Sequence, residues 1–319
     1  MTHATTPWPD ALAGTPAVAV IEQAIARSRL SHSLLLTGDD HDTLVLVAQA
    51  LADRLLNPPD AKARFAPDQH PDCFALRPAG KMRLISADAT RALINKVQTS
   101  AAVALHKVAI LHECDRMNVA AANVFLKTLE EPPAHTTLLL LTTRPYALLP
   151  TIRSRCLNFR FPGTVGGYSP DGWEAWLGDY HAWLQRLVDG GMDKKAIADS
   201  VLALYGLVSR FGAILDFATG EVWKQQKEKL PPDIEEDQQV AIETGIANGL
   251  RLRLFAEIAR ATRGFALPRL TQGDEVARRA LAAAIEKLEH DVSLLRVNLN
   301  EAAALEEFLL ASLRIWTRR

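Results

Sequence analysis

NVFLKTLEEPP (residues 123–133) is followed by an apolar run over residues 137–143 and then by LPTIRSRC (residues 149–156). The first stretch has apolar residues at helical spacing and ends in two prolines, so it predicts a helix over residues 118–130. The apolar run predicts a buried strand, and the third stretch predicts a basic turn before the next strand. A helix between short apolar strands is the unit from which a parallel sheet is built.

The first half of the chain repeats this alternation of short apolar runs and amphipathic stretches. Strands bounded by polar or turn residues are predicted at Ser33–Thr37, Cys73–Arg77, Lys107–His112, Thr137–Thr143 and Leu157–Phe161. Helices are predicted between them at Thr43–Leu56, Ser86–Thr99 and Asn118–Glu130, with Ser86 as an N-cap. We therefore expect an α/β domain with a parallel five-stranded sheet flanked by helices over residues 1–162.

The second half has a different pattern, which begins after a segment rich in glycine and proline, FPGTVGGYSP (residues 161–170). Tryptophan, tyrosine and leucine then recur at helical spacing over residues 173–187, which predicts a helix face packed in a core rather than a ligand cage. Further helices are predicted at Ala196–Phe217, Ala241–Thr262, Asp274–Val297 and Asn300–Trp316. The acidic stretch LPPDIEEDQQ (residues 230–239) predicts a loop inside the last domain.

The composition is typical of a globular protein in a reducing cytoplasm. Hydrophobic residues make up 48% of 319 residues, enough for two or three cores, and no apolar run has the length of a membrane span. The N-terminal sequence lacks the basic start and apolar stretch of a secretory signal. Three scattered cysteines (Cys73, Cys114 and Cys156) predict neither a disulfide framework nor a zinc site. The net charge of −1 argues against tight DNA binding by the chain alone.

The turn after the first strand, GDDHDTLV (residues 38–45), stands where a nucleotide-binding protein has G-x-x-x-x-G-K-[ST]. The first glycine is present as Gly38, but Thr43 replaces the second glycine, Leu44 the lysine and Val45 the Mg²⁺-binding hydroxyl. Three acidic residues also line the loop and would repel a triphosphate. The sequence therefore predicts a degenerate phosphate loop.

The strand over residues 107–112 ends where an ATPase has Asp-Glu, with the aspartate at Mg²⁺ and the glutamate activating water. Here His112 replaces the first acid, and Glu113 remains. Histidine is a poor ligand for Mg²⁺, which prefers oxygen. A transition-metal site formed by residues 112–115 is an alternative, disfavoured because successive strand residues point to opposite faces.

Taken together, these stretches resemble the clamp-loader AAA+ family of bacterial DNA polymerase III. That family shows N-x-x-L-K-x-L-E-E-P-P, then a sensor strand, then Ser-Arg-Cys, and this chain has the three in that order. The resemblance is clearest over residues 30–162. It implies an AAA+ domain over residues 1–162, a small helical lid over residues 163–218 and an all-α collar for oligomerisation over residues 219–319.

The resemblance also implies an arginine finger, which here is Arg155, flanked by Ser154 and Cys156 of the Ser-Arg-Cys motif. In the family this arginine points at ATP held by the adjacent subunit. A planar, permanently charged guanidinium suits that task, because it stabilises charge that develops on the transferring phosphoryl group. Arg153 is interpreted as a solvated surface arginine.

Other family positions are matched more loosely. Thr142 and Thr143 occupy the sensor-1 region, where a structural role is expected. Phe211, with Arg210 beside it, stands near the place of the sensor-2 arginine. Asn300 is predicted to cap the last helix of the collar. Many relatives carry a four-cysteine zinc module between the first two strands, but residues 57–71 contain no cysteine.

The resemblance therefore implies a clamp-loader subunit that is not catalytic alone and needs no ATP, Mg²⁺ or zinc of its own. Within a hetero-oligomeric polymerase holoenzyme, the partners implied are ATP-binding gamma/tau-type subunits and delta, with the sliding clamp and primer–template DNA reached through the complex, and no membrane. Alternatives are a divergent ATPase that uses Glu113, a delta-like clamp-opening subunit, and a DNA-binding module. The delta-type subunit typically lacks Ser-Arg-Cys, so it fits less well.

Overall fold

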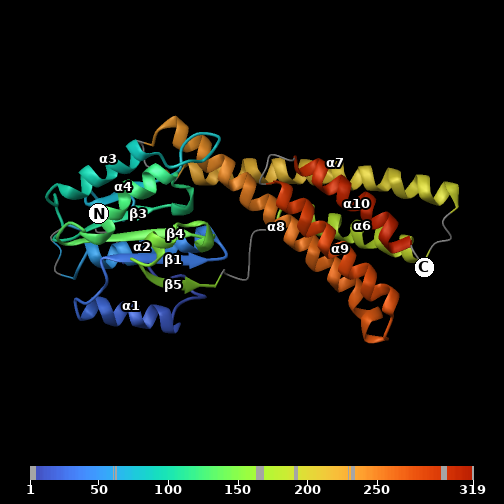
Figure 1. Ribbon diagram of the computed structural model, residues 1–319, viewed down its shortest axis with the longest axis horizontal. Helices are drawn as coiled ribbons and strands as arrows, with labels where there is room; N and C mark the ends of the chain where they lie inside the picture. Colours follow the sequence, from blue (N-terminus) through green and yellow to red (C-terminus); the bar gives the residue numbers. More distant parts are fainter. Residues whose placement is uncertain are drawn as a thin grey trace. The chain divides into compact units, whose positions relative to one another are not determined.

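A computed structural model describes residues 5–59, 61, 63–162, 169–189, 193–228, 230, 234–295 and 300–317 (Figure 1). The chain forms two compact units. The first comprises residues 1–167 with 230–242, and the second comprises residues 168–229 with 243–319. The predicted domain boundary at residue 163 lies in a stretch, residues 163–168, outside the described residues.

Unit 1 is built on five strands: β1 (Ser33–Gly38), β2 (Cys73–Leu76), β3 (Lys107–Leu111), β4 (Thr136–Thr142) and β5 (Leu157–Phe161). They form one parallel sheet in the order β2-β3-β4-β1-β5. Every residue of β1, β3 and β4 is buried, as expected for central strands covered on both faces. The predicted α/β fold is confirmed, and each strand begins and ends within one residue of its predicted bounds.

Helices cover both faces of this sheet: α1 (Pro16–Ala26), α2 (His41–Leu56), α3 (Ala87–Gln98), α4 (Val119–Glu130) and the short α5 (Pro150–Arg153). Two 3₁₀ turns, η1 (Cys114–Arg116) and η2 (Pro145–Ala147), follow β3 and β4. Ser86 caps α3 as predicted, because its hydroxyl accepts a hydrogen bond from the Ala89 amide at 3.1 Å. Asn118 caps α4 in the same way at the Ala121 amide, at 2.8 Å.

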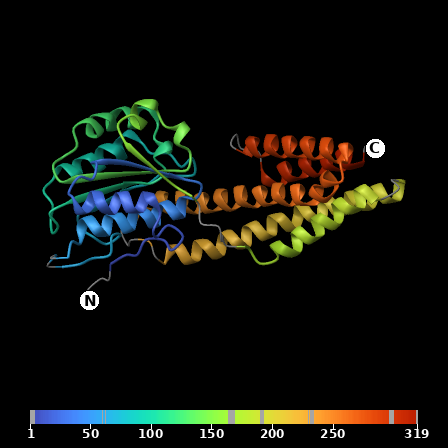
Figure 2. The same cartoon turned by 90° about the horizontal axis from the view of Figure 1, so that it is seen from below.

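Strand alternation divides the core of unit 1 into two layers. Leu34 and Leu36 of β1 pack on the side of α1 and α2, whereas Leu35 packs on the side of α3 and α4. Figure 2 shows the two helical layers on either side of the sheet. Successive side chains of a strand point into opposite layers, so the register of each strand is fixed. The loops at both edges of the sheet are positioned by that register.

Unit 2 is all-helical, with α6 (Trp173–Asp189), α7 (Lys194–Lys227), α9 (Glu275–Leu294), α10 (Glu301–Thr317) and most of α8 (Glu236–Thr271). The aromatic face of α6 lies at its centre. Trp176 is buried, and its indole N–H donates to the Leu207 carbonyl at 2.8 Å. The Tyr180 hydroxyl is 2.8 Å from the Thr262 hydroxyl. This confirms the prediction that the aromatic stripe is core packing.

The boundaries inside the second half differ from those expected. Helix α7 runs without a break across the predicted lid–collar boundary at 218/219, so the division into lid and collar stays a prediction. The prediction of a loop in the last domain over residues 230–239 is wrong in two respects. Helix α8 already begins at Glu236, where two acidic residues suit a helix N-terminus, and residues 230–242 belong to unit 1. There the Gly80 amide donates to the Asp237 carbonyl at 2.8 Å.

Among the described helices, α7 is long and apolar enough to cross a membrane by length and composition. Its buried residues, which include Leu204, Leu207 and Phe211, contribute to the core of unit 2 together with the aromatic residues of α6. One face of α7 therefore packs in the core of unit 2.

Candidate functional site

Gly38 ends β1 where the degenerate phosphate loop begins. A Cβ at this position would lie 2.6 Å from the Phe161 carbonyl oxygen and 3.1 Å from the Leu44 side chain. Only glycine therefore allows β1 and β5 to pair to their ends. The glycine has a packing reason that is independent of phosphate.

The N-terminus of α2 holds a carboxylate of the chain itself. The Asp40 side chain accepts hydrogen bonds from the Thr43 amide at 3.0 Å and the Thr43 hydroxyl at 2.7 Å. Amides at a helix N-terminus are the groups that bind phosphate in nucleotide-binding loops. Leu44 is fully buried in the apolar core, and Val45 packs against the same core. An incoming phosphate would thus meet a carboxylate, without a lysine or a hydroxyl to hold it.

His112 follows β3 and is buried beneath this loop. Its Nδ1 lies 3.2 Å from an Arg77 guanidinium nitrogen, and its ring meets the His41 ring edge-on at a centroid distance of 5.7 Å. Burial, with smaller contributions from nearby Arg77 and His41, holds the pKa of His112 well below its usual range. Burial also lowers the pKa of His41, although Glu113 opposes this shift. Two largely neutral imidazoles therefore lie between the start of α2 and the end of β3.

Glu113, the acid retained from the ATPase pattern, is held by cations. Its backbone has a φ of 45°, in the left-handed region. Its carboxylate forms an ion pair with Arg83 and lies 3.7 Å from Arg116. A glutamate that activates water needs an accessible, unengaged oxygen. The two arginines compete with that use.

The sensor-1 region is tied to the same sheet edge. The Thr142 hydroxyl donates to Asp115 Oδ1 at 2.7 Å, and Arg144 Nε donates to Asp115 Oδ2 at 3.0 Å. Thr143 is exposed. These contacts agree with a structural role for Thr142. The sequence points to Asp115 only as part of the alternative metal site, and it gives no signal for Arg144, because the two residues are 29 positions apart.

Arg155 lies on the surface between α5 and β5. Its Nε donates to Glu130 Oε1 at 2.8 Å, and its Nη1 donates to the Thr151 carbonyl at 2.8 Å. The Ser154 hydroxyl donates to the same carbonyl at 3.1 Å. Cys156 is half-buried, and burial raises the pKa of its thiol to about 12, so it is not a reactive thiolate.

The two candidate regions occupy opposite edges of the sheet. Gly38 pairs with Phe161 at the carboxyl end of β5, whereas Arg155 precedes Leu157 at the amino end of β5. The strand alone separates these ends by about 13 Å. We call the region formed by Gly38–Val45, His112 and Glu113 the carboxyl edge, and the region formed by Glu130, Thr151 and Arg155 the amino edge.

Comparison with known proteins shows what this part of the chain is similar to. Residues 14–164 match the family described as DNA polymerase III, delta subunit. The DNA polymerase III subunit delta' of Pseudomonas aeruginosa is 43% identical over 98 residues, which cover 31% of this chain and 30% of that protein. The delta' subunit of Escherichia coli is 41% identical over 87 residues, 27% of this chain and 26% of that protein. Over these residues the chain is similar to delta-prime subunits of DNA polymerase III.

The matched segments thus span less than a third of each of these two relatives. Among solved structures, a DNA polymerase III gamma subunit-related protein of Thermotoga maritima is 22% identical. It aligns over 93% of this chain and 99% of that chain, with a TM-score of 0.44. The parallel sheet with helices on both faces, followed by an all-helical region, is the fold expected from the resemblance to the clamp-loader AAA+ family.

The remaining predicted residues make contacts of other kinds. The Arg153 guanidinium stacks over the Tyr146 ring at 5.5 Å. In unit 2, Phe211 is buried in the core, and Arg210 forms an exposed ion pair with Asp179 at 2.5 Å. Phe211 therefore contributes packing, and Arg210 is engaged on the surface of its own unit.

No three His, Cys, Asp or Glu side chains are grouped to hold a metal ion among the residues that the structure describes. The alternative of a transition-metal site at residues 112–115 is not assembled there. His112 meets Arg77, Glu113 meets Arg83, and Cys114 is buried in the apolar core.

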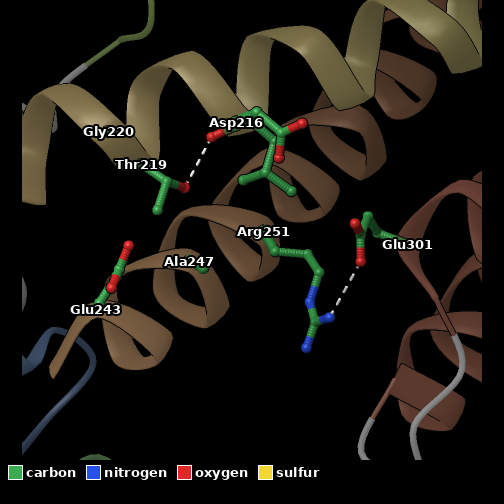
Figure 3. A pocket seen from close by; sticks show the side chains of 8 residues that line it. Asp216, Thr219, Gly220, Glu243, Ala247, Arg251 and Glu301 are labelled. Atoms are coloured by element: carbon green, nitrogen blue, oxygen red, sulfur yellow. Dashed lines mark hydrogen bonds and ion pairs between the residues drawn. The ribbon is translucent and has the colours of Figure 1, made fainter. Parts of the chain in front are cut away.

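A groove of about 280 Å³ lies in unit 2 between α7, α8 and α10 (Figure 3). Asp216 and Glu243 line it, and Arg251 reaches across it to Glu301 at 3.3 Å. Arg251 is also bound to the Asn248 side chain at 2.6 Å. These contacts tie α8 to α10 and stabilise the helical unit. No sequence motif predicts this groove, because its lining comes from three separate helices.

Proposed function

We propose that this chain is a non-hydrolysing subunit of a DNA polymerase III clamp loader, which takes part in loading the sliding clamp onto primed DNA. In this proposal Arg155 acts on ATP held by the neighbouring subunit. The observation that carries the proposal is the placement of Arg155 at the amino edge, opposite its own degenerate phosphate loop. An arginine so placed faces away from any nucleotide of its own chain and is exposed to a partner.

The geometry of the carboxyl edge supports the non-hydrolysing part of the proposal. Asp40 engages the amide and hydroxyl of Thr43, Leu44 is buried, and Glu113 is paired with Arg83. Replacing these contacts by a magnesium-bound triphosphate would break several of them at once. The divergent-ATPase alternative is disfavoured for that reason.

The partners proposed are those of the family: ATP-binding gamma/tau-type subunits, delta, and through the complex the sliding clamp and primer–template DNA. A cytoplasmic location and the absence of a nucleotide or metal cofactor belong to the same proposal. The net charge of −1 supports DNA contact through the assembly rather than through this chain alone.

The test of the finger is Arg155→Ala in the assembled complex, with assembly checked by mass measurement. An arginine finger contributes about 10³–10⁵ to kcat at the site it serves. We therefore expect the DNA-stimulated ATPase rate of the complex to fall by the contribution of the one site that Arg155 serves. Clamp loading should also slow. Arg155→Lys should behave similarly, because an ammonium lacks the planar fork. Arg153→Ala is the matched control and should keep the ATPase. Full ATPase in an intact Arg155→Ala complex would contradict the proposal.

The non-hydrolysing part has a separate test. Equilibrium binding of labelled ATP to the isolated chain should show no saturation at micromolar concentrations. Saturable, magnesium-dependent binding would favour the divergent-ATPase alternative instead. A salt-dependent complex between the isolated chain and primer–template DNA would favour the DNA-binding module.

A further inference from the structure

Glu130 accepts hydrogen bonds from one side of the Arg155 guanidinium. Its Oε1 is 2.8 Å from Arg155 Nε and 2.5 Å from Nη2. The Thr151 carbonyl, 2.8 Å from Nη1, accepts from the other side. Nη1 is also 3.5 Å from the Ser154 hydroxyl, at the limit of a hydrogen bond.

A guanidinium has five N–H donors in a fixed plane. Glu130 uses the donor on Nε and one on Nη2, and Thr151 uses one on Nη1. Among the residues that the structure describes, the second donor on Nη2 has no acceptor, and the second donor on Nη1 has at most the Ser154 hydroxyl at 3.5 Å. Two terminal donors of a guanidinium can bind two phosphate oxygens end-on. The contacts of Arg155 thus restrain the plane of its side chain and leave its terminal donors only weakly engaged at the end that would meet a phosphate.

We propose that Glu130 is a positioning residue that orients the Arg155 fork toward the nucleotide of the neighbouring subunit. This inference rests on the proposed function of Arg155. Glu130 does not touch the nucleotide; it limits the rotation of the guanidinium, so that less conformational freedom is lost when the phosphate is engaged. It belongs to the stretch at residues 123–133, and its place at the end of α4 sets its carboxylate beside α5.

The pair is weak enough to allow adjustment. The side chains of Arg155 and Glu130 remain 35% and 49% exposed, and an exposed ion pair of this kind contributes at most about 1 kcal/mol. Loss of the orientation should therefore cost about two- to fivefold in rate rather than the whole effect of the finger.

The chain offers a matched control in Glu131. It has the same charge, is adjacent in the chain and lines a groove of about 290 Å³ between α3 and α4. Its carboxylate makes no ion pair with any residue that the structure describes. A general effect of negative charge at the end of α4 would therefore appear in both glutamates, whereas positioning of Arg155 belongs to Glu130.

The experiment measures kcat and KM for ATP in the assembled, DNA-stimulated complex. Glu130→Ala should lower kcat at the site facing this chain about two- to fivefold, and lower kcat/KM equally. Glu130→Gln should restore kcat to within about twofold, because the amide oxygen still accepts from Nε. Glu131→Ala should leave both constants unchanged.

Measurements in the Arg155→Ala variant distinguish the positioning role of Glu130 from the proposed function of Arg155. If Glu130 acts through Arg155, then adding Glu130→Ala to Arg155→Ala changes nothing further. An equal loss in both backgrounds, or no loss from Glu130→Ala beside a clear loss from Arg155→Ala, overturns the positioning role alone. An active Arg155→Ala complex overturns the proposed function and this inference with it.

Discussion

The two edges of one sheet are built in opposite ways. At the carboxyl edge, charged and polar groups bond to each other: Asp40 to Thr43, Glu113 to Arg83 and His112 to Arg77. Most of these groups are buried or half-buried. At the amino edge, the Arg155–Glu130 pair is exposed and leaves donors open. Both edges are formed by loops at the ends of the same parallel strands. The fold by itself therefore does not decide which edge binds a ligand.

This difference indicates which edge of the sheet can still bind a ligand. A network of buried, paired groups is costly to open, because each broken contact leaves an unpaired group in a poorly solvated place. Beside an exposed pair, the remaining donors can take a phosphate at little cost, because they already exchange hydrogen bonds with water. The carboxyl edge thus behaves as part of the core, and the amino edge as a surface for a partner.

The strongest test of this difference between the two edges is Leu44→Lys, which restores the phosphate-binding lysine at the carboxyl edge. Leu44 is fully buried, so an ammonium placed there must lose its charge or its packing. We expect the free energy of unfolding to fall by about 4 kcal/mol or more. Leu46, 50% exposed on the same helix, gives the control: Leu46→Lys should stay within about 0.5 kcal/mol. A stable Leu44→Lys chain that binds ATP would show that the carboxyl edge is not closed.

A second prediction concerns the junction of β1 and β5. Gly38→Ala places a Cβ 2.6 Å from the Phe161 carbonyl, so backbone must move, and we expect a loss of about 1–3 kcal/mol in urea unfolding. Gly178→Ala in α6 meets no atom within 4 Å and should instead gain about 0.5–1 kcal/mol from helix propensity. A neutral Gly38→Ala would mean that Gly38 is not needed for packing.

The buried imidazoles give the carboxyl edge a pH dependence. The pKa of His112 lies well below 6.5 in the folded chain because of burial, so the unfolded chain takes up a proton first as the pH falls. Stability should be fully present above pH 6.5 and should decline below it by at most about 1.4 kcal/mol per pH unit for this group. His41 changes in the same direction.

Urea unfolding measured between pH 7.5 and 5 checks this slope. The double substitution His41→Gln and His112→Gln should flatten it, whatever its effect on absolute stability. An unchanged slope in the double variant would assign the acid sensitivity to other groups. The Arg155→Ala variant should keep the wild-type slope, because the exposed pair does not involve these imidazoles.

The sequence predicts the sheet well for a physical reason. Strands such as 107–111 and 136–142 are buried on both faces, so their apolar runs are continuous and short. The sequence does not predict helix α1, by contrast, and it predicts a loop at the start of α8, because residues 230–239 are polar. Polar composition describes exposure, and an exposed helix end has the same composition as a loop.

The candidate sites were predictable as residues but not as contacts. The substitutions at Thr43, Leu44 and His112 are visible by their chemistry alone. The capping of Thr43 by Asp40 and the pairing of Arg83 with Glu113 depend on backbone turns, one of them with positive φ at Glu113. The Arg155–Glu130 pair joins residues 25 positions apart and needed the register of β5 to be known.

The smallest expected change in the free energy of unfolding is at the amino edge. Because the variants there stay folded, a change in their ATPase activity can be assigned to function. Glu130→Ala and Arg155→Ala should each change the free energy of unfolding by less than about 1 kcal/mol, because the pair they break is exposed. In a double-mutant cycle read by urea unfolding, their coupling should be about 0.2–1 kcal/mol. A larger coupling would mean that the pair is part of the core like the carboxyl edge, and a loss of ATPase in either variant would then reflect misfolding. A small coupling beside a large loss of ATPase places the function of Arg155 outside its own chain.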